Sequence, residues 1–201
     1  MHPDLNPDGW IETRWGTRFS VVSPKLEDIK MTDIVWSLSQ IARFGGHTSR
    51  FYSVAQHSIE VALRVIHEQS MGDGFFRPIC EMSRIVREAI LHDAAEAYLG
   101  DIPSPIKRHL PDYRKLERRL DAAIRERFDL PAEISPEIRV ADLQALEAEA
   151  NDLGFSTASE WGFHAQKSTF EREGYDFLEM NPAEVRGEFM AIFAASWNPN
   201  P

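Results

Sequence analysis

Apolar residues recur at spacings of three and four along most of the chain from residue 31 onward, which is the period of amphipathic helices. The pattern predicts helices at about residues 31–44, 53–71, 78–99, 112–128 and 182–197, and another that starts at Ser135. Gly45, Gly72 and Gly100 are expected to end helices, because glycine adopts positive φ without strain. The sequence therefore predicts an all-α bundle of about six or seven helices.

Three segments lack the helical period. Residues 1–30 contain several prolines and a short β-prone stretch, so we expect an arm with a small hairpin. The segment Asp101–Pro105 contains two prolines, which remove backbone donors, so a stiff loop is expected. Residues 154–175 are irregular. We expect one domain over residues 1–201, with an arm (1–30), a core (31–150) and a C-terminal irregular segment and helix (151–201).

Composition and charge narrow the class of protein. The chain is 43% hydrophobic and 27% charged, as in folded domains rather than disordered chains. Its net charge of -10 argues against a surface that mainly binds nucleic-acid polymers or anionic lipid. A single cysteine, Cys80, excludes an internal disulfide and a thiolate metal site. With no signal-like N-terminus and no membrane-length apolar stretch, we expect a cytoplasmic protein without a membrane partner.

Imidazole and carboxylate groups fall on the apolar faces of the predicted helices. His57 lies in the middle of one helix, the pair His92 and Asp93 in the next, and Asp142 in a later one. Taken singly, a buried histidine is commonly hydrogen-bonded in a core, and an aspartate on a helix is commonly solvated. A carboxylate among apolar residues is costly unless its charge is neutralised. Together the four residues make a mixed nitrogen and oxygen ligand set for a metal ion.

The order of these residues resembles the signature of the HD phosphohydrolase superfamily, in which a His, a His-Asp pair and a distant Asp lie on successive helices. The chain looks most like its 5′-deoxynucleotidases and their small deoxynucleoside triphosphate triphosphohydrolase relatives. Members carry an Arg and an aromatic residue before the first His, here Arg43 and Phe44, and a run HDxxExxxGDxPxPxK, here residues 92–107. The similarity covers about residues 31–146. Residues 45–48, Gly-Gly-His-Thr, look more like the triphosphohydrolases.

The resemblance implies an HD-domain helical bundle and a metal-dependent phosphohydrolase that cleaves the 5′ phosphoester of 2′-deoxynucleotides. The implied ligands of a divalent ion (manganese, cobalt, iron, zinc or magnesium) are His57, His92, Asp93 and Asp142. Such an ion would lower the pKa of bound water and neutralise charge on phosphorus. Glu96 and Asp101 are the implied general acid and base. The alternative for Glu96 is an exposed acid that pairs with Lys or Arg.

An acidic protein needs placed cations to hold a phosphorylated substrate. Arg43 can offer a bidentate fork to phosphate, and Phe44 can cover the sugar or base. Lys107 and His47 are candidates for contacts to outer phosphates. Without the resemblance, each of these cations would be taken as an ordinary surface charge.

Several functions are compatible with this pattern. We expect, by a slight preference based on residues 45–48 and the extra cations, hydrolysis of deoxynucleoside triphosphates to deoxynucleoside and triphosphate. The alternatives are a 5′-deoxynucleotidase acting on monophosphates and a nucleotide-binding HD module without turnover. A phosphodiesterase for cyclic or bis-nucleotides fits less well, because additional histidines are usual in such multi-metal sites. A homo-oligomer is expected because relatives assemble, with Trp161 and Trp197 as candidate subunit contacts.

Overall fold

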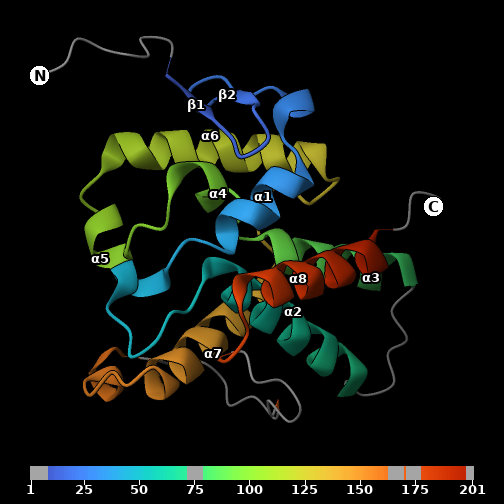
Figure 1. Ribbon diagram of the computed structural model, residues 1–201. Coiled ribbons are helices and arrows are strands. Elements are labelled where there is room, and N and C mark those ends of the chain that lie inside the picture. Colours follow the sequence, from blue (N-terminus) through green and yellow to red (C-terminus); the bar gives the residue numbers. More distant parts are fainter. Residues whose placement is uncertain (1–8, 72–78, 163–169, 171–177, 198–201) are drawn as a thin grey trace, which may run out of the picture.

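A computed structural model describes residues 9–71, 79–162, 170 and 178–197 (Figure 1). The helices in these residues are α1 (Met31–Leu38), α2 (Val54–Met71), α3 (Ile79–Leu91), α4 (Glu96–Leu99), α5 (Ser104–Lys107), α6 (Pro111–Arg127), α7 (Pro136–Asp152) and α8 (Pro182–Ser196). The predicted helical fold is confirmed, and α6 and α8 agree closely with the predicted ranges. Among the described helices, none has the length and apolar character needed to cross a membrane.

The predicted hairpin in the N-terminal arm is confirmed. Strands β1 (Trp10–Glu12) and β2 (Arg18–Ser20) pair antiparallel, with Ile11 opposite Phe19. Phe19 is fully buried, and its ring stacks on Tyr98 of α4 at a centroid distance of 3.9 Å. The hairpin lies beside α6, at the opposite side of α1 from α8 (Figure 1). It is therefore part of the packed structure rather than a free arm.

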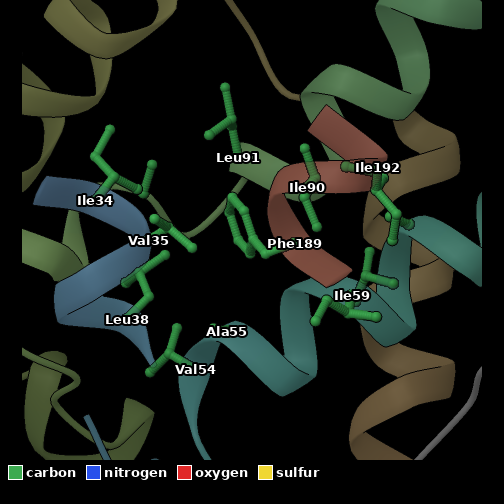
Figure 2. Close-up of a cluster of buried hydrophobic side chains, with 14 of the residues drawn as sticks. Ile34, Val35, Leu38, Val54, Ala55, Ile59, Ile90, Leu91, Phe189 and Ile192 are labelled. Atoms are coloured by element: carbon green, nitrogen blue, oxygen red, sulfur yellow. The ribbon is translucent and has the colours of Figure 1, made fainter. Parts of the chain in front are cut away.

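The core forms where α1, α2, α3 and α8 meet. Helix α2 packs against α3, α7 and α8, so that even its polar residues near the N-terminal end are buried. Phe189 of α8 is fully buried, and its ring lies between Val35 of α1 and Ile90 of α3 in the view of Figure 2. The other labelled residues of this buried cluster are Ile34, Leu38, Val54, Ala55, Ile59, Leu91 and Ile192 (Figure 2). His57, the fourth residue of α2, thereby lies inside the molecule with no exposed surface.

The long helix predicted for residues 78–99 is interrupted. Helix α3 ends at Leu91, a turn follows, and α4 starts at Glu96. In the turn the backbone bonds tighten from the helical i−4 pattern to i−3, as in Ala94 N to Leu91 O at 3.0 Å. The His92 Nδ1 atom also contacts the carbonyl oxygen of Ala89 at 2.7 Å. Because consecutive side chains on a continuous helix point about 100° apart, the turn is what lets His92 and its neighbour face one point.

The first predicted helix ends early. Helix α1 stops at Leu38, where the Ser39 hydroxyl donates to the carbonyl oxygen of Trp36 at 2.8 Å and competes with helical bonding. A 3₁₀ turn, η2 (Arg43–Gly46), follows after an extended stretch. Within it Phe44 has a φ of 56°, a left-handed conformation that is strained for a bulky residue. The early end of α1 leaves this turn free to approach the buried end of α2.

The proline-rich segment is a loop only in its first part. Gly100, with a φ of 78°, leads from α4 into the non-helical residues 101–103, as predicted. Residues from Ser104 then form α5, with Pro105 in its first turn, where the missing backbone N–H has no helical partner. The prediction of a loop through Pro105 is therefore wrong by two residues, Ser104 and Pro105, which belong to this helix. That helix brings Lys107 back toward α4.

Helix α7 starts where Ser135 predicts, but its details differ. The Ser135 hydroxyl donates to Glu88 Oε2 at 2.5 Å instead of capping the helix. Two apolar residues of the predicted stripe, Val140 and Leu143, are 41% and 45% exposed. The buried residues of α7 are Ile138, Ala141, Gln144, Ala145, Glu149 and Ala150. The small alanines let α7 lie close to α2.

Candidate metal and phosphate site

The four residues predicted to bind a metal ion come together. His57 projects from α2, His92 and Asp93 from the turn after α3, and Asp142 from α7. His57 Nε2 lies 3.2 Å from His92 Nε2, and His92 Nε2 lies 3.2 Å from Asp93 Oδ2. His57 Nε2 also lies 3.1 Å from Asp142 Oδ1 and 3.7 Å from Asp93 Oδ2. Donor atoms of His57, His92 and Asp142 all lie within 4.8 Å of one another.

The hydrogen bonds of the two imidazoles show that this point suits a cation. His57 Nδ1 lies 2.6 Å from Glu149 Oε1, and His92 Nδ1 lies 2.7 Å from the carbonyl oxygen of Ala89. Carboxylate and carbonyl oxygens only accept, so in neutral rings both Nδ1 atoms carry the proton. Each Nε2 then directs a lone pair at the other, 3.2 Å away, beside two carboxylates. A proton or a divalent ion at this point relieves the repulsion, so the donor set fits a cation.

The charges around the two histidines also favour a cation. Burial and a neighbouring guanidinium oppose protonation of His57, but Glu149 and Asp142 outweigh them and raise its pKa to about 10. Burial opposes protonation of His92 as well, and Asp93 outweighs it, so this pKa is also raised. The site is therefore negative enough to hold a positive charge despite its burial.

Glu96, the predicted acid, lies at the start of α4 and is 6% exposed. Its Oε1 atom lies 3.3 Å from Lys107 Nζ, while Oε2 is buried and makes no hydrogen bond within the described part of the chain. Burial, and then the charges of Asp93 and Asp101, raise the pKa of Glu96 to about 9. Burial also raises the pKa of Asp101. In the metal-free chain Glu96 thus holds a proton at neutral pH.

Arg43 borders the cluster on another side. Its Nη1 atom lies 3.7 Å from Asp93 Oδ2, and its side chain is 11% exposed. Its Nε and Nη2 atoms each lie 3.1 Å from Glu149 Oε2. The bidentate edge predicted for phosphate is therefore used by Glu149, and Nη1 is the nitrogen that faces the cluster. The Phe44 ring lies beside Arg43, with 5.3 Å between the guanidinium carbon and the ring centre.

Lys107 and His47, the two residues predicted to contact outer phosphates, lie in different surroundings. Lys107 Nζ contacts Glu117 Oε1 at 2.7 Å in addition to Glu96 at 3.3 Å. Lys107 thus pairs mainly with the carboxylate of Glu117. His47 is exposed at the end of the η2 turn. Lys107 therefore lies beside Glu96, the predicted general acid.

Comparison with known proteins identifies the family. Residues 30–151 match the family described as 5′-deoxynucleotidase YfbR-like. A protein of Escherichia coli (strain K12), YfdR, described as uncharacterized, is 38% identical over 184 residues, which is 92% of this chain and 93% of that protein. The chain belongs to the YfbR-like family. It is therefore a metal-dependent phosphohydrolase, as the resemblance to the HD superfamily predicts.

Relatives named as 5′-deoxynucleotidases match a shorter part of this YfbR-like chain. One from Photorhabdus temperata is 33% identical over 94 residues, which is 45% of this chain and 47% of that protein. One from Vibrio cholerae is 33% identical over 94 residues, with 43% and 46% covered. These matches support a nucleotide phosphohydrolase. They favour the monophosphate alternative over the triphosphate substrate preferred in the sequence analysis.

Two residues at the site of this YfbR-like protein, Glu149 and Glu117, are not predicted from the sequence. Glu149 is fully buried and lies two turns after Asp142, on the same side of α7. An acid in line with a predicted ligand, within the alanine-containing run 145–150, is the signal that points to it. Glu117 contacts Lys107 from α6. It lies in a highly charged segment, so its sequence context gives no such signal.

Proposed function

We propose that the chain hydrolyses 2′-deoxynucleoside 5′-monophosphates to the deoxynucleoside and orthophosphate. The main support is the meeting of two imidazoles and two carboxylates at one point, beside a buried carboxyl group, Glu96, that holds a proton. Membership of the YfbR-like family supports the same substrate class.

His57, His92, Asp93 and Asp142 would hold the divalent ion, because their donor atoms face one another from separate elements. When bound, such an ion neutralises charge on the phosphate and lowers the pKa of water. The mixed nitrogen and oxygen set suits manganese, cobalt, iron, zinc and, less strongly, magnesium.

Glu96 and Asp101 would move the protons. Because Lys107 contacts Oε1 of Glu96, the buried Oε2 is free to carry the transferable proton. Glu96 donates it to the 5′ oxygen as the bond between phosphorus and that oxygen breaks. Water supplies the oxygen that completes orthophosphate, and Asp101 accepts a proton from it. The raised pKa of Asp101, caused first by burial, makes it a stronger base than an ordinary aspartate.

Arg43 and a group of aromatic rings would hold the nucleotide. The Nη1 atom of Arg43 faces the cluster and would donate to a phosphate oxygen. The Phe44 ring packs on Phe155 at 5.0 Å and lies 6.2 Å from Trp161. These rings give the sugar or base an apolar surface next to the phosphate site. Trp161, a predicted subunit contact, thereby has ring partners within the chain.

The contacts of Lys107 favour a monophosphate over a triphosphate. A triphosphate brings extra negative charge, which needs cations beyond those at the reacting phosphorus. Lys107 already pairs with the Glu117 carboxylate at 2.7 Å and contacts Glu96 at 3.3 Å, so it is poorly placed to serve outer phosphates as well.

A product assay tests the proposal. Purified protein is incubated with deoxynucleoside mono- and triphosphates, with ribonucleoside monophosphates and with cyclic dinucleotides, each with Mn²⁺, Co²⁺ or Mg²⁺, and the products are separated by chromatography. We expect deoxynucleoside and orthophosphate from the deoxynucleoside monophosphates. The variant Glu96→Gln is expected to lower kcat about 10²- to 10⁴-fold, the usual contribution of a general acid. Glu126→Gln, at an exposed position of α6, is the control.

Other products would replace the proposal by one of its alternatives. Release of intact triphosphate would establish the triphosphohydrolase, and turnover of cyclic dinucleotides would establish a phosphodiesterase. Metal binding without turnover of any nucleotide would establish a binding module. The homo-oligomer and the cytoplasmic location stay predictions, of which the first is checked by light scattering.

A further inference from the structure

Glu149 is the most extensively bonded carboxylate beside the metal cluster. It is fully buried on α7, and both of its oxygens are used. Oε1 accepts from His57 Nδ1 at 2.6 Å and lies 3.2 Å from the Tyr52 hydroxyl. Oε2 accepts from Nε and Nη2 of Arg43, each at 3.1 Å. One carboxylate therefore contacts a metal ligand on one side and the predicted phosphate-binding residue on the other.

The bond to His57 decides which ring nitrogen faces the cluster. With Nδ1–H donated to Glu149, the Nε2 lone pair is directed at the cluster. Carboxylates bonded to the outer nitrogen of a ligand histidine fix its tautomer and increase its basicity. Rotation of the His57 ring would break this 2.6 Å contact inside a packed helix interface.

The bonds to Arg43 decide how its guanidinium is oriented. Two nitrogens on one edge of the planar group are held by Glu149 Oε2, which leaves Nη1 directed toward Asp93 at 3.7 Å. If Glu149 lost its negative charge, the positive charge of Arg43 beside the proposed metal site would no longer be neutralised by it. Loss of Glu149 would therefore also disfavour the metal ion by repulsion.

Tyr52 connects Glu149 to a second buried ion pair, Glu60 and Arg64. The Tyr52 hydroxyl, fully buried, also lies 3.3 Å from Glu60 Oε2. Glu60 Oε1 accepts from Arg64 at 3.0 and 2.7 Å. All residues of this chain of contacts are buried, so they have little freedom to move: Arg64, Glu60, Tyr52, Glu149 and His57.

We propose that Glu149 is a positioning residue that links metal binding to substrate binding, by holding the His57 ring and the Arg43 guanidinium with one carboxylate. The inference rests on the proposed function for the role of Arg43, and on the cluster geometry alone for the role of His57. Glutamine at this position keeps the shape but loses the charge. Its amide also offers a single acceptor oxygen, so it cannot accept from both partners on opposite sides.

The first test is the metal affinity of the metal-free protein, measured by competition with a chromophoric chelator for Mn²⁺, Co²⁺ and Zn²⁺. Glu149→Gln is expected to weaken the affinity about 10- to 100-fold. Glu88→Gln is the matched control, because Glu88 is also buried, and its described partners Arg125 and Ser135 are not among the proposed ligands. We expect its metal affinity to stay within about two-fold of the wild type. Equal affinities for wild type and Glu149→Gln would overturn the proposal.

A second variant covers the case in which Glu149→Gln does not fold. Tyr52→Phe keeps the ring and removes a hydroxyl that contacts Glu149. It is expected to weaken metal affinity about three-fold, the effect of one hydrogen bond. Unchanged affinity in this variant would then overturn the proposal.

The coupling between Glu149 and Arg43 is tested by measuring KM in single and double variants. Arg43→Lys should raise KM by a larger factor in the wild-type background than in Glu149→Gln, because the second protein has already lost the orientation of Arg43. Equal factors would overturn the link. If the wild type binds metal but hydrolyses no nucleotide, the proposed function fails, while the affinity test still decides the role of Glu149 toward His57.

Discussion

Glu96 shows how strongly the surroundings of one residue can change its chemistry. Its pKa in the folded chain is about 9, raised by burial and then by Asp93 and Asp101, against an ordinary value of 4.5. Between these two pH values the folded chain holds a proton that the unfolded chain has lost. The free energy of unfolding therefore decreases as pH rises from about 4.5 to about 9.

We predict that Glu96→Gln stabilises the metal-free protein at pH 8. The amide removes the ionisation that folding opposes, so Tm should rise by about 2 to 4 °C, as expected for ~1 kcal/mol in a domain of this size. At pH 4 the carboxyl group is protonated in both states, and the difference should vanish. Calorimetry of both proteins at the two pH values measures this. Equal Tm values at pH 8 would contradict the altered pKa.

The site also shows which residues a sequence discloses. His57, His92, Asp93 and Asp142 could be selected because charged groups on apolar helix faces need a partner, and their order is a known signature. Glu149 could not be assigned a role in this way. Its partners, His57 and Arg43, lie far from it in the chain, and only the packing of α7 on α2 brings them within bonding distance.

At the scale of elements, the ends of helices control where the acids lie. Gly100 ends α4 with a φ of 78°, a conformation strained for other residues, and no described atom lies within 4 Å of an added Cβ. Gly187 lies within α8, and an added Cβ there also has open space around it. The two positions thus differ in backbone conformation but not in steric room.

We predict opposite effects of alanine at these glycines. Gly100→Ala should lower the free energy of unfolding by about 1 to 3 kcal/mol through backbone strain, and should lower kcat because Glu96 and Asp101 flank this position. Gly187→Ala should stabilise the protein by about 0.5 to 1 kcal/mol, with activity unchanged. Urea unfolding and steady-state kinetics measure both effects. Stabilisation by Gly100→Ala would show that the described conformation is wrong.

Periodicity predicted most helices, because each of them buries one apolar stripe. The interruption between α3 and α4 was not predictable from it, since residues 89–99 are mostly good helix formers. The turn there depends on the His92 contact to Ala89 and on the packing of α4 against α1. On α7 the pattern predicted the helix but not its buried face, because the apolar residues Val140 and Leu143 are exposed.

At the scale of the whole molecule, the metal cluster joins elements from distant parts of the chain. Its proposed ligands come from α2, from the turn after α3 and from α7. An ion that binds only the folded chain adds stability according to its concentration relative to Kd. The metal should therefore stabilise the fold as a whole rather than one loop.

We predict that Mn²⁺ or Co²⁺ at about 100 times its Kd raises Tm by about 5 to 10 °C, since such binding contributes about 2.7 kcal/mol. A chelator should reverse the shift. His92→Ala, which lacks a ligand, should show almost no shift, whereas the exposed-site variant Glu126→Gln should respond like the wild type. A full shift in His92→Ala would mean that the ion binds elsewhere.

The turn between α3 and α4 links the proposed metal site to the predicted proton donor. The proposed ligand His57 belongs to α2, which packs with α3 and α8, whereas Glu96 belongs to α4, which packs on α1 and, through Tyr98, on Phe19 of the hairpin. Because α1 also packs on α2 and α8, the distance between these two groups is set within one core. Variation at the N-terminal hairpin acts on Glu96 through Tyr98, so it is expected to change the rate of hydrolysis more than the retention of the metal.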